Sequence, residues 1–95
     1  MNFERKSLIE KLAKNYREAD NELQIFCDTN PGFGACNLTQ WGLSLARGRS
    51  NNEEIPEIGR KVGLALHTLN QEIERCVNLG DKITDVLKVT EKILQ

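Results

Sequence analysis

Apolar residues recur at alternating spacings of three and four through the C-terminal half of the chain. Alternating threes and fours keep side chains on one stripe of a helix, and a stripe sustained over about five heptads indicates a seam that packs against another helix. Ten of the twelve positions in the series are apolar: Ile55, Ile58, Val62, Ala65, Leu69, Glu72, Cys76, Leu79, Ile83, Val86, Thr90 and Ile93. The pattern predicts one long helix over residues 56–95.

The signals at the start of this helix agree with the prediction, whereas one glycine inside it leaves an alternative open. Pro56 stands among the acids Glu53, Glu54 and Glu57, and proline and acids are favoured in the first turn of a helix. Gly80 followed by Asp81 would also fit the end of one helix and the cap of another. Because the seam continues across Gly80, we favour a continuous helix, about 60 Å long at 1.5 Å per residue.

The N-terminal region, residues 2–27, shows the same kind of stripe, with charged residues on the opposite face. Its apolar positions follow 3-4-3-4-3 spacing: Ile9, Leu12, Tyr16, Ala19, Leu23 and Phe26. This predicts an amphipathic helix of about 39 Å. Asp20 and Asn21 are poor helix formers, so a break there is the competing interpretation. The uninterrupted phase of the stripe favours a single helix.

Residues 28–37 contain Pro31 and two glycines and should end the first helix. Phe33, between the glycines, either folds back onto the bundle or presents an apolar knob to a partner. Asn37 or Thr39 can cap a short helix over residues 38–47, in which Trp41 and its neighbour Gly42 would lie at a helix crossing.

These elements together predict an all-α fold: an antiparallel helical bundle of two long amphipathic helices and one short helix, in a single domain over residues 1–95. The helix over residues 56–95 would be longer than its neighbours can cover. We therefore expect dimerisation, in the manner of a coiled coil, to complete the bundle. The expected contact residues are Val86, Leu87, Ile93 and Leu94.

Composition narrows the class of protein without defining a function. The chain of 95 residues is 39% hydrophobic and 28% charged, with a net charge of −1. This balance is ordinary for a globular domain and gives no overall attraction to nucleic acid or membrane. No apolar run reaches the ~20 residues that span a bilayer. The three cysteines, without an export signal, suggest reduced thiols and a cytoplasmic protein.

The sequence contains no motif for catalysis, a metal or a cofactor, and we expect a protein that is not an enzyme. His67, the only histidine, should point away from the core and has no nucleophile with an orienting acid beside it in the sequence. The cysteines are too widely spaced for a typical zinc site. Glu72 on the seam is expected either to pair with a cation of the facing helix and fix the register, or to mark a seam open to water.

Two functions remain as hypotheses. The first is a protein–protein interaction module, such as an adaptor, a small regulator or a chaperone-like protein, which binds itself or another helical protein. The alternative is a small DNA-binding transcriptional regulator with a basic loop and helix start (Arg47, Arg49, Arg60 and Lys61). The alternative has less support, because the loop over residues 48–54 is long for a helix-turn-helix and carries two acids.

Overall fold

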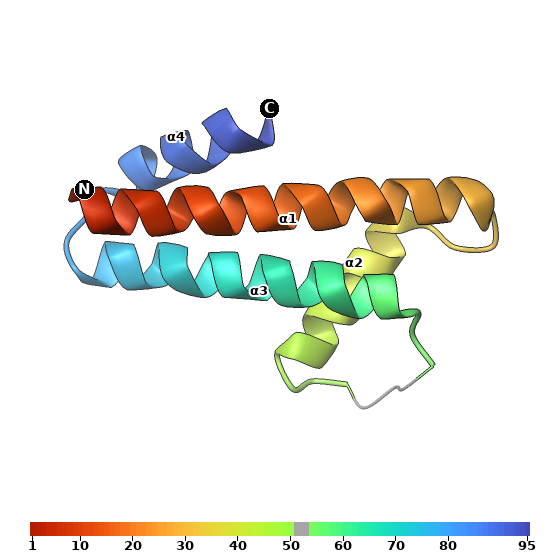
Figure 1. Ribbon diagram of the computed structural model, residues 1–95. Helices are drawn as coiled ribbons and strands as arrows, with labels where there is room; N and C mark the ends of the chain where they lie inside the picture. The colour runs from red at the N-terminus through yellow and green to blue at the C-terminus, as the bar shows by residue number, and fades with distance from the viewer. Residues whose placement is uncertain (51–53) are drawn as a thin grey trace.

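The structure is a computed structural model, which describes residues 1–50 and 54–95 and shows four helices (Figure 1). They are α1 (Phe3–Thr29), α2 (Ala35–Ala46), α3 (Glu57–Asn78) and α4 (Ile83–Leu94). The described residues include no strand, and the helices pack against one another. The predicted all-α bundle is confirmed. Glu53, taken above as part of a helix start, lies outside the described residues.

Helix α1 is a single helix, so the alternative break near Asp20 does not occur. Its first turn is capped by Asn2, whose side-chain oxygen accepts a hydrogen bond of 2.8 Å from the backbone N–H of Arg5. This contact satisfies one of the amide groups that a helix start leaves without an intrahelical partner. The helix ends at Thr29, and its C-cap residue Asn30 directly precedes Pro31, as the turn residues predict.

Helix α2 begins at Ala35, earlier than the predicted residue 38, and neither Asn37 nor Thr39 caps it. Thr39 lies inside the helix, and its hydroxyl donates to the carbonyl of Ala35 at 2.9 Å. A hydroxyl that bonds back to a carbonyl four residues earlier is compatible with a helix interior. The capping prediction was wrong because the helix starts earlier, with Gly34 at its N-cap, so that Asn37 and Thr39 both lie inside it.

Helices α2 and α3 cross with their backbones in direct contact. A Cβ atom added to Gly42 would lie 2.8 Å from the carbonyl carbon of Gly59 and 3.2 Å from the Cα of Gly63. A Cβ on Gly63 would in turn overlap the backbone of Gly42. Glycine is needed at both positions because no side chain fits between the two helices. The expected close approach at Gly42 is thus present, with Trp41 partly buried beside it.

The predicted continuous helix over residues 56–95 is wrong, because the chain turns back at Gly80. Gly80 has φ +104°, a conformation that other residues rarely adopt. The N–H of Asp81 donates to the carbonyl of Cys76, and the N–H of Gly80 donates to the carbonyl of Val77, both at 3.0 Å. These two hydrogen bonds form a Schellman motif, which satisfies the last carbonyls of α3 and ends it.

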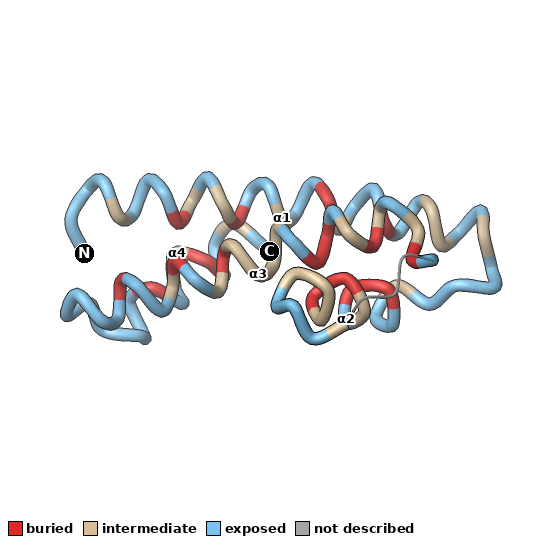
Figure 2. Tube along the Cα trace, turned by 90° about the horizontal axis from the view of Figure 1, so that it is seen from below, coloured by how far each residue is buried: buried red, intermediate tan, exposed pale blue. Residues whose placement is uncertain are grey.

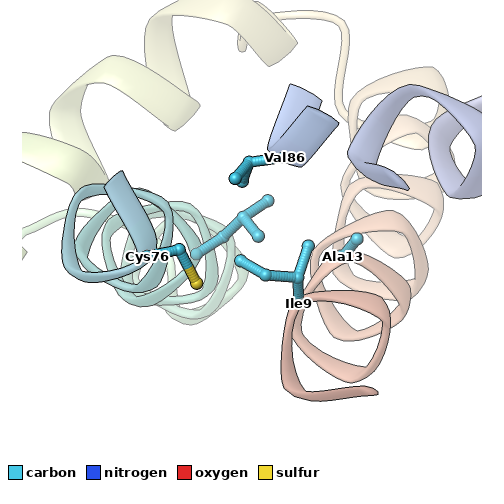
Figure 3. Close-up of a cluster of buried hydrophobic side chains, with 5 residues drawn as sticks. Ile9, Ala13, Cys76 and Val86 are labelled. Carbon is cyan, nitrogen blue, oxygen red and sulfur yellow. The ribbon is translucent and has the colours of Figure 1, made fainter. Parts of the chain in front are cut away.

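After this turn, α4 packs back onto its own chain, where it contacts α1 and, less extensively, α3 (Figure 1). Figure 3 shows Val86 of α4 pointing toward Ile9 of α1 and Cys76 of α3. The buried cluster there consists of Ile9, Ala13, Leu69, Cys76 and Val86. The apolar stripe of the last helix is therefore largely covered within the monomer, whose longest dimension is 42 Å.

A second buried cluster lies toward the other end of the α1–α3 pair, where α2 and the residue before α3 complete it. Its members are Ala19, Leu23, Leu38, Ile55 and Val62. Helices α2 and α4 make no contact with each other. Buried segments accordingly line the inner side of α1 at two separate places along its length (Figure 2). Helices α1 and α3 therefore form a central pair, and each shorter helix covers one part of it.

We predict that Gly42→Ala lowers the free energy of unfolding by about 2 kcal/mol, because the added methyl forces the α2–α3 crossing apart. Gly32→Ala is the matched control, since a Cβ there meets no atom within 4 Å. The control should leave stability unchanged or raise it by up to about 1 kcal/mol. Urea unfolding of both variants measures the difference, and equal stabilities would show that the helices do not touch at Gly42.

Candidate interaction surface

Helix α4 carries two overlapping apolar stripes, of which the monomer buries one. The buried stripe consists of Val86 and Thr90, with Val89 and Ile93 partly covered beside them. The second stripe follows 4-3-4 spacing: Ile83, Leu87, Thr90 and Leu94. At 100° per residue, its three aliphatic members lie within about 40° of one another around the helix. Their exposed fractions are 53% for Ile83, 39% for Leu87 and 41% for Leu94. We call Ile83, Leu87 and Leu94 the outer stripe.

The four predicted contact residues of the C-terminal helix therefore divide into two pairs. Val86 is fully buried, and Ile93 is half-buried because it packs against the core of its own chain. Leu87 and Leu94 are exposed. Ile83, assigned above to the buried seam, is exposed as well. The sequence held a signal for it, because the second 4-3-4 series is visible once α4 is treated as a helix of its own.

An ion pair fixes the turn that leads into α4. Nε of Arg5 donates to one carboxylate oxygen of Asp81 at 2.7 Å, and Nη2 donates to the other at 3.2 Å. The Asp81 side chain is almost fully covered, and the amino group of Met1 lies 3.6 Å from it. Farther along the chain, the guanidinium of Arg17 donates to the backbone carbonyl of Ile93 at 3.0 Å. Two arginines of α1 thus hold the two ends of the α4 segment.

The Arg5 guanidinium, through its hydrogen bonds, lowers the pKa of Asp81 despite the opposing effect of desolvation. A carboxyl group whose pKa is lower in the folded chain than in the unfolded one stabilises the fold above the unfolded pKa, which is near ~3.9 for aspartate. That contribution is lost as the pH falls through the lower, folded pKa. The attachment of α4 should therefore weaken in acid.

Glu72, the one carboxylate on the α3 seam, finds its partner within its own helix. Arg75, one turn later, donates from Nη2 to one carboxylate oxygen at 2.6 Å and from Nε to the other at 2.9 Å. This pairing lowers the pKa of Glu72. No cation of the facing helix is involved, so the expectation that Glu72 fixes the register between helices was wrong. The seam is not open there either, because Glu72 is 8% exposed.

Among the described residues, no group of three or more histidine, cysteine and acidic side chains could hold a metal ion. Cys76 is buried, and burial followed by the nearby Glu72 charge raises the pKa of its thiol, which disfavours the reactive thiolate. Cys36 is exposed and Cys27 is half-buried. His67, which was predicted to point away from the core, is half-buried.

Two of the four basic residues of the DNA-binding alternative already have interaction partners within the chain. Lys61 pairs with Glu22 of α1 at 2.7 Å. Arg60 also has an interaction partner and lines a shallow hollow with Leu45 and Leu64. Arg47 and Arg49 are exposed at the end of α2.

Phe33 adopts the first of its two predicted arrangements and folds back toward α1. Its ring packs against Phe26, with ring centroids 5.7 Å apart and planes inclined at 47°. This tilted arrangement is a favourable one for aromatic pairs. The ring still exposes 40% of its surface, so part of it is available beside the contact.

None of the described helices combines the length and the apolar character needed to cross a bilayer. Comparison with protein-family models, with curated proteins and with solved structures gave no match. The geometry of the outer stripe is therefore the starting point for a function.

We predict that Asp81→Asn destabilises the protein most near neutral pH, and that the difference from wild type shrinks below about pH 4. The reason is that the wild-type carboxylate becomes protonated there and loses its charge-assisted bonds to Arg5. Chemical unfolding at a series of pH values measures this difference. Asp28→Asn is the control, because Asp28 is exposed and makes no ion pair with a described residue. A loss of stability in Asp81→Asn that does not vary with pH would contradict the assignment.

Proposed function

We propose that this protein is a non-enzymatic protein–protein interaction module that associates with a second copy of itself through the outer stripe of α4. The observation that supports the proposal is that Ile83, Leu87 and Leu94 are exposed on one side of a helix whose other apolar stripe is already buried. Spacing of this kind suits contact with another helix. The class of protein that fits is an adaptor, a small regulator or a chaperone-like helical protein.

A two-fold dimer with antiparallel α4 helices would use the stripe completely. In an interface of this symmetry the same patch is contributed by both copies. Ile83 at the start of one α4 would then lie opposite Leu94 at the end of the other, and the two Leu87 side chains would lie near the axis. Because Ile83 and Leu94 are both aliphatic, this arrangement places apolar side chains opposite one another at both ends of the stripe.

The stripe extends toward the α3–α4 turn, where Leu79 is also exposed. The helix itself contributes a contact of about 16 Å along its axis, from Ile83 to Leu94, at 1.5 Å per residue. A contact between two single helices of this length buries less area than a standard protein interface, which covers about 800 Å² per partner. The proposed dimer is therefore weak and depends on concentration.

We predict that Leu87→Glu prevents self-association and leaves the monomer folded, because the new carboxylate lies at the centre of the stripe on an exposed position. Sedimentation velocity over a range of protein concentrations measures the association, and circular dichroism checks the fold. Ile25→Glu is the matched control, since Ile25 is 65% exposed on α1 and lies outside the stripe. The control should associate as the wild type does.

Two results would overturn the homodimer. One is a wild-type protein that stays monomeric at millimolar concentration. The other is an equal effect of both substitutions. In the first case a different helical protein becomes the candidate partner of the outer stripe.

A further inference from the structure

A groove runs between α1 and α4 on the side of α4 that faces away from the outer stripe. Lys92 lies nine residues after Ile83, which is half a turn around the helix at 100° per residue. The groove has a volume of about 220 Å³. Its lining consists of Lys6 and Glu10 from α1 and Lys88, Val89, Lys92 and Ile93 from α4.

The lining has an excess of positive charge in a chain whose net charge is −1. Three ammonium groups face one carboxylate, which leaves a local charge of +2. Within the described part of the chain, the side chains of Lys6, Lys88 and Lys92 make no hydrogen bond or ion pair. Three cations elsewhere in the described chain have acidic partners: Arg5 pairs with Asp81, Lys61 with Glu22 and Arg75 with Glu72.

The bottom of the groove is apolar. Val89 and Ile93 are both half-buried and pack against the cluster that contains Ile9 and Val86. A ligand would therefore meet aliphatic carbon below and ammonium groups at the rim. The volume lies below the range of roughly 300–1,000 Å³ that is usual for sites of drug-sized ligands, so the groove fits a small molecule.

We infer that this groove binds a small organic oxyanion with a short aliphatic chain, such as a carboxylate or a phosphate monoester. The lysine ammonium groups would attract the anionic head, and the chain would lie on Val89 and Ile93. Glu10 would repel the anionic head group, but the attraction of the three lysines would exceed this repulsion.

Both walls of the groove exist only while α4 lies against α1. A ligand that binds this arrangement stabilises it, since binding to one state shifts the equilibrium toward that state. The inference does not depend on the proposed dimer, because the outer stripe occupies the opposite side of α4.

Titrations of the full chain followed by ¹H–¹⁵N and methyl NMR test the inference. Four probes separate the contributions: hexanoate, acetate, hexanamide and hexyl phosphate. We expect hexanoate or hexyl phosphate to shift the signals of Val89 and Ile93 and to bind at least about tenfold more tightly than acetate or hexanamide, because only these two combine charge with a chain. The tighter of the two identifies the head group.

Substitution of the rim lysines provides the second arm. Lys88→Gln combined with Lys92→Gln should weaken binding of the tighter probe about tenfold or more, because it removes two of the three cations. Lys11→Gln combined with Lys14→Gln is the control, since these exposed lysines do not line the groove. Hexanoate and hexyl phosphate that bind no more tightly than hexanamide would overturn the inference, as would equal losses in the two double variants.

Discussion

Gly80 reverses the chain after α3, and the position of α4 follows from that single backbone conformation. With φ at +104°, the residue allows the final carbonyls of α3 to bond to the N–H groups of Gly80 and Asp81. The next helix then returns along α1, and Val86 enters the cluster of Ile9 and Cys76 (Figure 3). Burial of a valine-sized side chain stabilises a fold by about 1.5–3 kcal/mol, so the reversal supports a substantial part of a small core.

The sequence predicted the helical elements better than it predicted how they are joined. The stripe of α1 identified a single helix because no backbone breaker interrupts its phase. The phase of the C-terminal stripe was misleading for a physical reason: α3 and α4 face the same core, and both need apolar residues there. The short connection between them preserves the 3-4 spacing, so periodicity alone did not distinguish one straight helix from two helices joined by a turn.

The contacts that hold α4 in place could not be predicted from local pattern. Arg5 and Asp81 are 76 residues apart, and their pairing depends on α1 and α3 being antiparallel. Once Asp81 bonds to Arg5, it no longer serves as the helix cap that its position suggested. Gly42 at the α2–α3 crossing was easier to anticipate, because a small residue beside a tryptophan indicates close packing.

The same reversal determines which surfaces α4 offers. The side of α4 that carries Val86 is buried within the monomer. The groove between α1 and α4 exists because the two helices lie side by side. The outer stripe remains on the exposed flank, where Ile83, Leu87 and Leu94 have no neighbour within the described chain that covers them fully. A straight helix would have exposed a different and longer stripe, and Val86 and Ile93 would have been part of it.

The most direct test of this account is an isotope-filtered methyl NOE experiment between Val86 and Ile9, which lie in the same buried cluster. Dilute samples of uniformly labelled protein, and mixtures of labelled and unlabelled chains, distinguish contacts within a chain from contacts between chains. The account predicts an NOE between Val86 and Ile9 that persists on dilution and is absent from the spectrum selective for contacts between chains. An NOE found only between chains, or none at all, would show that α4 does not fold back onto its own α1.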